Sequence, residues 1–472
     1  MSRDKTPLSR AQLLGLCAMA IAVLVIANDF TALSVALPAI ETQFSSDVTT
    51  VQWVITGYAL VFGVLIVSGG RLADMFGRRR IFLVGATIFS VFSVLAGLAT
   101  DVWMLIIARG VMGVGGALMW PAVLGMTYSL LPPRREALGG SLIMTAAGMG
   151  NAVGPLLGGV LTDLASWRWI FLLNLPVTLI AMLVTWRVVA VDEVHRDEQR
   201  IDYFGVLVLS IGLLALLYSL DAGTDTGWTN PMILGLFVLS AISLMIFFLI
   251  ERRVGPNALI PRDVFTNPAF LAASLATLLM SAIFFAALLY LPQFMTKHLG
   301  YSAIKSGAGL LPVMGTFALT SYLAGPLYER LGARLVVSIG AGCLALGMYV
   351  LSGLHQSTSY IDMVPGMVIL GIGIGLFYSS ITTAGITAVD SSRASLAGAI
   401  IYMFQIAGGS IGLGLNTALV VTAPILSAGI HRAFLVDAAL AVCGLLVSVL
   451  FVGGRLEKGR WHALVHRHRA HG

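Results

Sequence analysis

The stretch Gly70-Arg71-Leu72-Ala73-Asp74-Met75-Phe76-Gly77-Arg78-Arg79-Arg80 lies between two long apolar runs and decides how the rest of the chain is interpreted. Its single carboxylate, Asp74, precedes Arg78 by four residues, and Gly70 and Gly77 flank it. The arginines alone would be explained as an anchor at one end of a membrane span. The acid and the two glycines are not explained in that way, and they predict a tight, charged turn between two helices.

The composition around this turn is that of a membrane protein. Of 472 residues, 58% are hydrophobic and only 11% are charged, whereas about 25% are charged in a typical soluble domain. A soluble chain of this length would need a charged surface that so few residues cannot supply. The net charge of +6 is scattered over short segments between apolar runs, so we do not expect nucleic acid as a partner.

Residues with special chemistry exclude further classes of function. The three cysteines lie inside apolar runs, where small buried thiols are more typical than a disulfide framework. All eight histidines fall outside the predicted spans, so we expect no intramembrane metal and no cofactor. The phosphate-binding pattern GxxxxGK[ST] is absent from the sequence, so ATP is not expected to drive the protein.

Apolar runs long enough to cross about 30 Å of hydrocarbon recur along the chain. We expect each to be a helix, because lipid offers no partner for backbone N–H and C=O groups. Fourteen spans are predicted, approximately at residues 12–39, 51–69, 81–99, 102–130, 138–162, 168–190, 203–221, 231–250, 269–292, 306–327, 335–354, 363–388, 394–422 and 433–453. Asp29 interrupts the first run and Pro38 is expected to end it, which argues against a cleaved signal peptide.

Lysine and arginine set the predicted orientation. With the N-terminus in the cytoplasm, the inner segments hold 23 basic residues and the outer segments hold four, and Arg109 lies inside a span. Basic residues collect on the cytoplasmic side of membrane proteins. We therefore expect a multi-pass protein of the plasma membrane with both termini in the cytoplasm.

An internal repeat divides the spans into two sets. A shift of 255 residues aligns Gly70, Asp74 and Gly77 with Gly325, Glu329 and Gly332. The predicted fold is all-α, with two bundles of six helices and two inserted helices. The expected parts are residues 1–190 for the N-terminal bundle, 191–268 for a connector and the inserted helices, 269–453 for the C-terminal bundle, and 454–472 for a basic tail. Repeated halves are typical of secondary transporters.

Two charges inside the predicted membrane region are the first candidates for function, because a charge at mid-membrane costs at least about 2.5 kcal/mol. Asp29 lies about ten residues from the outer end of span 1 and Arg109 about seven from that of span 4, so their depths differ by only about 5 Å. They could meet, either as a proton switch or as a permanent structural pair. Asp437 and Asp221 lie near outer span ends, where capping by interfacial water is the simpler reading; either could instead attract a cationic substrate.

Span 5 has a small-residue pattern, formed by Gly150, Gly154, Pro155, Gly158 and Gly159. Small residues at this spacing let a second helix approach closely, and the proline permits a bend. Aromatic side chains in other spans are candidates for an adaptable cavity surface, although most such residues simply face lipid or the core. The candidates are Trp120, Phe284, Tyr402 and Phe404.

The turn at residues 70–80 resembles the loop signature of the major facilitator superfamily. Asp29-x-Thr31 followed by Ala36-Leu37-Pro38 resembles the first span of its fourteen-span drug:proton antiporter group. Arg109 with Gly113 and Ala117, the glycines of span 5, and Trp167-Arg168-Trp169 with Phe171, Asn174 and Pro176 resemble further motifs of that group. The resemblance covers nearly the whole chain.

The resemblance implies proton-driven export of amphipathic compounds by alternating access. It implies proton coupling by Asp29 and Arg109, and a conformational latch formed by Gly70, Asp74, Gly77 and Arg78 against the start of span 11. The implied partners are a small-molecule substrate, protons and the lipid bilayer, and a monomer is compatible with this. Export or import of one specific metabolite is the first alternative. A membrane scaffold or a membrane-embedded enzyme is the alternative of another class, and we expect no enzyme because no catalytic cluster occurs in a span.

Overall fold

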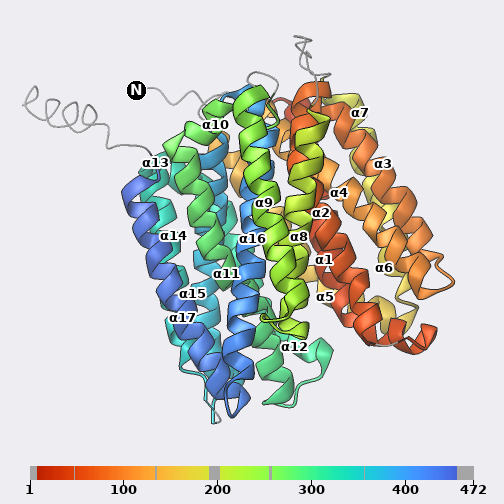
Figure 1. The fold of residues 1–472 in the computed structure, drawn as a ribbon, viewed down its shortest axis with the longest axis vertical. Helices are drawn as coiled ribbons and strands as arrows, with labels where there is room; N and C mark the ends of the chain where they lie inside the picture. Colours follow the sequence, from red (N-terminus) through yellow and green to blue (C-terminus); the bar gives the residue numbers. More distant parts are fainter. Residues whose placement is uncertain are drawn as a thin grey trace, which may run out of the picture.

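The computed structural model describes residues 8–46, 48–132, 135–190, 202–254, 258–355 and 357–453. Long helices stand side by side through the molecule (Figure 1). The N-terminal set is α1 (Arg10–Phe44), α2 (Val48–Phe76), α3 (Arg78–Gly97), α4 (Val102–Leu130), α5 (Glu136–Leu164), α6 (Arg168–Leu172) and α7 (Asn174–Val188). The inserted helices are α8 (Tyr203–Thr226) and α9 (Pro231–Val254). The remaining elements are α10 (Arg262–Thr266), α11 (Pro268–Lys297), α12 (Ala303–Gly309), α13 (Leu311–Leu331), α14 (Ala333–Ser352), α15 (Tyr360–Ile386), η2 (Ser391–Arg393), α16 (Ala394–Val421) and α17 (Leu426–Phe451).

Thirteen segments of the described chain are long and apolar enough to cross a membrane. They correspond to thirteen of the fourteen predicted spans. The other one, predicted at 306–327, consists of α12 and α13, where threonine, serine, tyrosine and proline residues make the segment less apolar. α13 packs against α5 and α15 inside the helical assembly. Ser321 is fully buried there, so a polar position of α13 faces protein rather than lipid, and apolarity alone passes over the helix.

The helices pack in two groups that meet along a shared interface. In the first group α1 packs on α5 and α7, and α4 packs on α2 and α3; in the second, α11 packs on α16 and α17, and α14 on α15 and α17. The groups meet where α2 packs on α16 and where α5 packs on α13 and α15. The inserted helices pack on each other, and α8 also contacts α2 and α16 (Figure 1). The insert therefore lies beside the interface between the groups.

The two ends of the molecule carry different short elements. Figure 1 shows α10 at one end and α12 at the other. We call the end with α10 and the α2–α3 turn the inner end, and the opposite end the outer end. The predicted basic tail at 454–472 and most of the predicted connector before α8 lie outside the described residues.

One proline differs from the expectation, and a second marks a helix break. Pro38 does not end the first span, because α1 continues through it to Phe44. A proline inside a helix removes one backbone donor and bends the helix, and it need not stop it. Pro312, in contrast, lies in the first turn of α13, directly after the break that separates α12 from α13. Proline is favoured in the first turn because its missing N–H has no partner there in any case.

Candidate functional site

Asp29 of α1 and Arg109 of α4 form an ion pair in the interior of the first group. Their exposed fractions are 1% and 0%. Arg109 Nη1 donates to Asp29 Oδ2, and Arg109 Nε donates to the carbonyl oxygen of Val54 at 2.9 Å. The two charges that the sequence placed at similar depth thus lie in direct contact. Removing one partner of such a pair would leave an uncompensated buried charge, at a cost of about 3–5 kcal/mol.

Two polar residues that the sequence reasoning did not assign hold the carboxylate from its other side. Asn174 Nδ2 donates to Asp29 Oδ1 at 3.2 Å and to Ser93 Oγ at 3.1 Å. Ser93 in turn donates to the carbonyl oxygen of Phe171 at 2.8 Å. The sequence marks Asn174 only as part of a motif of the resembled group, without a role. The signal for Ser93 was a polar residue inside an apolar run, which is weak because serine is tolerated in spans.

Aromatic rings connect the ion pair to the interface between the groups. The Arg109 guanidinium lies 4.2 Å from the centroid of the Tyr58 ring. Tyr58 lies 6.0 Å from Phe62, which lies 5.6 Å from Tyr402 of α16, ring centroid to ring centroid. Within the described residues, Arg109 Nη2 and the Tyr58 hydroxyl are buried without a hydrogen-bond partner. Polar atoms that can gain a bond are therefore present beside the ion pair.

The four aromatic candidates lie in different parts of the molecule. Trp120 and Tyr402 meet across the interface with ring centroids 4.4 Å apart. Phe284 belongs to a second aromatic cluster, with Tyr378 at 5.8 Å and Phe317 at 6.3 Å. Phe404 follows Tyr402 by two residues on α16, and residues two apart point to different sides of a helix.

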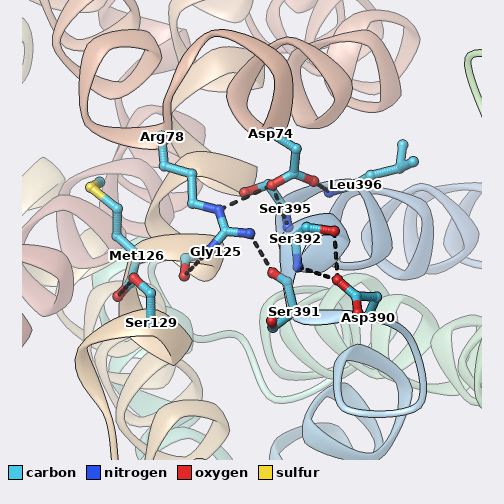
Figure 2. Close-up of polar contacts among 10 residues, drawn as sticks. All are labelled: Asp74, Arg78, Gly125, Met126, Ser129, Asp390, Ser391, Ser392, Ser395 and Leu396. Atoms are coloured by element: carbon cyan, nitrogen blue, oxygen red, sulfur yellow. Dashed lines mark hydrogen bonds and ion pairs between the residues drawn. The ribbon is translucent and has the colours of Figure 1, made fainter. Parts of the chain in front are cut away.

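Asp74 and Arg78 tie the α2–α3 turn to the N-terminus of α16 (Figure 2). Arg78 Nε donates to Asp74 Oδ1 at 3.0 Å. The same carboxylate accepts from the backbone N–H groups of Ser395 at 3.3 Å and Leu396 at 2.8 Å. A carboxylate at a helix N-terminus is stabilised by the unpaired N–H groups and by the helix dipole. The contact joins the two groups at the inner end.

Arg78 extends the contact to both sides. Its Nη1 donates to the carbonyl oxygen of Gly125 in α4 at 3.2 Å, and its Nη2 donates to that of Ser391 at 2.6 Å (Figure 2). Hydrogen bonds from Ser392 hold the pKa of the neighbouring Asp390 carboxyl below its usual value. Asp390 therefore stays ionised at neutral pH and fixes the short η2 turn that presents the Ser391 carbonyl.

Glycines make this close approach possible. A Cβ at Gly70 would lie 2.7 Å from the Cβ of Ala399, and one at Gly125 would overlap the Ser395 hydroxyl. Gly77 has φ +97, a conformation that other L-residues rarely adopt. The glycines at positions 70 and 77 thus have separate functions: the first admits α16 and the second allows the turn.

The predicted partner of this latch was wrong. The start of span 11, which is α14, does not receive Asp74; the start of α16, predicted as span 13, does. The reason is the arrangement of the groups, since α16 is the helix of the second group that packs on α2 and α4. α14 packs instead on α15 and α17 within its own group.

The small residues of α5 form two faces. A Cβ at Gly150 would lie 2.7 Å from the carbonyl oxygen of Leu24, and Cβ atoms at Gly154 and Gly158 would overlap atoms of α1. Gly159 and Pro155 face the other group: a Cβ at Gly159 would lie 3.2 Å from Ile304, and one at Gly307 would lie 3.2 Å from Pro155. α5 therefore lies between α1 and the second group.

Asp437 does not lie at a solvated helix end, as the sequence suggested. α17 begins at Leu426, several residues before the predicted span, and Asp437 has an exposed fraction of 0%. Its Oδ1 accepts from Asn416 Nδ2 of α16 at 3.0 Å. Apolarity placed the start of the span too late because a polar stretch forms the first turns of the helix. The side chain of Asp221 is not among those described.

A sequence profile, related sequences and a solved structure all point to one protein family. The sequence profile described as "Major Facilitator Superfamily" matches residues 19–413. Multidrug resistance protein Stp of Mycobacterium tuberculosis is 32% identical over 409 residues, which cover 86% of this chain and 75% of the relative. Puromycin resistance protein pur8 of Streptomyces alboniger is 33% identical over 428 residues, which cover 90% and 83%.

A solved structure has the same fold. The human organic anion transporter MFSD10 (TETRAN) superimposes with a TM-score of 0.68, covering 93% of this chain and 99% of that one at 13% sequence identity. At this identity the likeness concerns the fold alone. The profile match over most of the chain, the relatives about one-third identical and the shared helical arrangement lead to one conclusion: this multi-pass membrane protein belongs to the Major Facilitator Superfamily.

Proposed function

We propose that this protein exports amphipathic organic compounds from the cell in exchange for protons. The observation that carries the proposal is the buried ion pair between Asp29 and Arg109, since a charge pair in the membrane interior is retained at a cost that a purely structural helix contact does not require. The substrate class is supported by relatives whose names state multidrug resistance and puromycin resistance. A scaffold or an enzyme has no comparable support.

The proton step uses the carboxylate of Asp29. While Asp29 is ionised, it pairs with Arg109 and accepts from Asn174. A proton arriving from the outer side neutralises the carboxylate and weakens both contacts, because each is strongest with the charged form. Arg109 Nη1 then loses its ionic partner and can donate a hydrogen bond to another acceptor. The helices α1, α4 and α7 thereby change their mutual packing when the proton binds and again when it leaves to the cytoplasm.

The latch at the inner end controls access. In the described arrangement Asp74 caps α16 and Arg78 bonds to Ser391, so the inner end is held shut. Opening toward the cytoplasm breaks these bonds and lets substrate enter from the cytoplasm or inner leaflet. When the latch closes again, the bound substrate is released on the outer side. The aromatic contacts of Tyr402 with Phe62 and Trp120 lie on the interface that parts during this motion.

Purified protein in liposomes provides the test, with ethidium as the transported probe. An acidic interior should drive ethidium into these liposomes against its concentration gradient, as protons leave in exchange. Asp29→Asn should abolish this pH-driven uptake while the protein remains in the membrane. Asp29→Glu, which keeps a carboxyl, should retain measurable coupling.

A matched control separates loss of this carboxyl from loss of any carboxyl. Asp362 is exposed in the first turn of α15, where it accepts from Ser359. Asp362→Asn should leave pH-driven uptake unchanged, since the asparagine oxygen can still accept from the N-cap residue Ser359. Undiminished uptake by Asp29→Asn would remove Asp29 from the mechanism, and absence of uptake in the wild type would remove proton-driven export altogether.

A further inference from the structure

The second group contains a buried carboxyl that the mechanism above does not use. Asp437 lies on α17 with an exposed fraction of 0%, and Asn416 of α16 is equally buried. Asn416 Nδ2 donates to Asp437 Oδ1 at 3.0 Å and to the carbonyl oxygen of Gly412 at 2.9 Å. Since Asp437 is eleven residues into α17, it lies about 16 Å from the helix start. The pair is therefore deep in the membrane region.

Two oxygens of this pair are without partners. Among the described residues, Asp437 Oδ2 and Asn416 Oδ1 are buried and accept no hydrogen bond. In the part of the chain that the structure describes, Asp437 takes part in no ion pair. A buried carboxylate oxygen that accepts no hydrogen bond, such as Asp437 Oδ2, can gain a proton without displacing another donor.

The titratable groups on the packed helices do not supply a cation. Facing Asp437 from α11 is Tyr290, whose hydroxyl bonds to Thr417 of α16 at 2.8 Å. The other titratable groups on α11, α14 and α16 within the described chain are Lys297, Arg334, Cys343, Tyr349 and Tyr402. Arg334 is held by the carbonyl oxygen of Val452 at the inner end of α17, and Lys297 lies in the last turn of α11 at the outer end.

The remaining titratable groups lie on α17 itself. His431 contacts the carbonyl oxygen of Ser352 at the outer end, Arg432 is exposed, and Cys443 is exposed. Arg432 precedes Asp437 by five residues and so projects from a different side of the helix. Asp437 is thus surrounded by neutral groups, in contrast to Asp29, which lies against a guanidinium.

This contrast has an energetic consequence. Arg109 lies against Asp29 and compensates a charge there, whereas a charge on Asp437 would be buried without a partner, which is costly. A carboxyl that holds a proton avoids this cost. The repeat gives no equivalent of the pair, since the 255-shifted positions of Asp437 and Asn416 are Met182 and Leu161. Each half therefore has its own carboxyl, in a different setting.

We propose that Asp437 with Asn416 forms a second proton-binding site, so that one transport cycle carries two protons, one in each half. This rests on the proposed proton-driven export. The proton binds Oδ2 of Asp437, while Oδ1 keeps its bond from Asn416, and it leaves from the same oxygen to water. α16 links the site to the transport cycle, because this helix carries Asn416, the interface residue Tyr402 and the N-terminus that Asp74 caps.

Infrared spectroscopy tests proton binding without transport. The C=O stretch of a protonated carboxyl is followed as pH is raised on the purified protein in lipid nanodiscs, with protons as the only ligand. Wild type should show a buried protonated-carboxyl band that Asp437→Asn removes and Asp437→Glu shifts. Asp362→Asn, which changes an exposed carboxyl, should leave the band in place. An identical spectrum for wild type and Asp437→Asn would overturn the proposal.

A gradient measurement tests the stoichiometry. With the membrane potential held at zero, the ethidium gradient at balance rises about tenfold per pH unit for each coupled proton. Wild type should reach about a 100-fold gradient for one pH unit, and Asp437→Asn should reach about tenfold. Equal gradients for the two proteins would overturn a second coupled proton. No pH-driven gradient in either protein would instead refute the proposed function, and the infrared result would still decide whether Asp437 binds a proton.

Discussion

The ion pair at Asp29 depends on residues that carry no charge. Arg109 compensates the carboxylate from one side, and Asn174 donates to it from the other while also bonding to Ser93. A hydrogen bond to a charged group contributes about 1.5–3 kcal/mol, which is comparable with the cost of placing a charge in a span. The amide is therefore one of the contacts that hold the Asp29 side chain in the interior.

Replacing this amide should reduce coupling without removing the ion pair. Asn174→Ala is expected to lower pH-driven ethidium uptake at least about tenfold, since one bond to a charged group is lost. The measurement is the initial uptake rate in proteoliposomes at equal protein content. Thr178→Val is the matched control, because Thr178 lies one turn further along α7, is buried, and its hydroxyl has no partner among the described residues. Equal rates for the two variants would contradict a role for Asn174.

Charged residues were the predictable part of the site. Asp29 and Arg109 could be located from the sequence because charges are rare and costly in a span, and the helical rise fixes their relative depth. The contacts of Asn174, which the sequence marks only as a motif residue, and of Ser93 could not be located in this way, because uncharged polar residues are common in spans. Asp437 was placed wrongly, since hydropathy cannot detect helical turns that are polar, such as those from Leu426 onward.

At the scale of helices, the latch is an asymmetric use of a repeated segment. Asp74 caps α16, whereas Glu329, its counterpart in the repeat, is exposed. Gly70 and Gly325 nevertheless have equivalent surroundings: the first lies against Ser395 of α16 and the second against Ser141 of α5. Both repeats therefore keep the close approach at the inner end, but only the first adds a charged cap.

Removing that charge should open the inner end. In a protein without its native cysteines, Ser141→Cys places a thiol in the buried contact between α5 and α13 at the inner end. Asp74→Asn should increase the labelling rate of this thiol by a membrane-impermeant maleimide, since the cap at α16 loses its charge-assisted bonds. Glu329→Gln should leave the rate unchanged. Labelling that is equally slow in both variants would exclude the latch.

The contact between α1 and α5 makes a separate prediction about stability. A Cβ at Gly158 would overlap the backbone carbonyl of Ala32, which cannot rotate away, whereas nothing lies within 4 Å of a Cβ at Gly315. Gly158→Ala should therefore lower the melting temperature of the purified protein by several degrees. Gly315→Ala should leave it unchanged or raise it, because alanine is favoured over glycine in a helix. A higher melting temperature for Gly158→Ala would contradict this packing.

Helix number and order were predictable, but helix partners were not. Apolar length located the spans because lipid leaves the backbone no alternative to a helix. The same argument contains no information on which helices meet across the two groups, so the latch was assigned to α14 instead of α16. It also cannot place local breaks such as the one at Leu173, between α6 and α7.

For the molecule as a whole, the inserted helices are connected to the latch through a series of contacts. Glu251 near the end of α9 is buried and accepts from the backbone N–H groups of Leu259 and Ile260, each at 3.0 Å. The following short helix α10 carries Asp263, which pairs with Arg393 at the end of η2. Ser391, in the same η2 turn, accepts from Arg78 of the latch. The insert is thus connected at its inner end to the latch between the two groups.

The distribution of basic residues predicts the orientation of the whole molecule, and this prediction can be tested directly. Green fluorescent protein fused after Gly453 should fluoresce, because it folds in the cytoplasm, and alkaline phosphatase at the same position should be inactive. Fusions after His355, in the loop between α14 and α15 at the outer end, should give the opposite pair of results. The 23 basic residues of the inner segments favour this direction over its inverse, since basic loops are retained on the cytoplasmic side. Active phosphatase after Gly453 would invert the molecule, and the latch that joins Asp74 to α16 would then close the outer side instead of the cytoplasmic one.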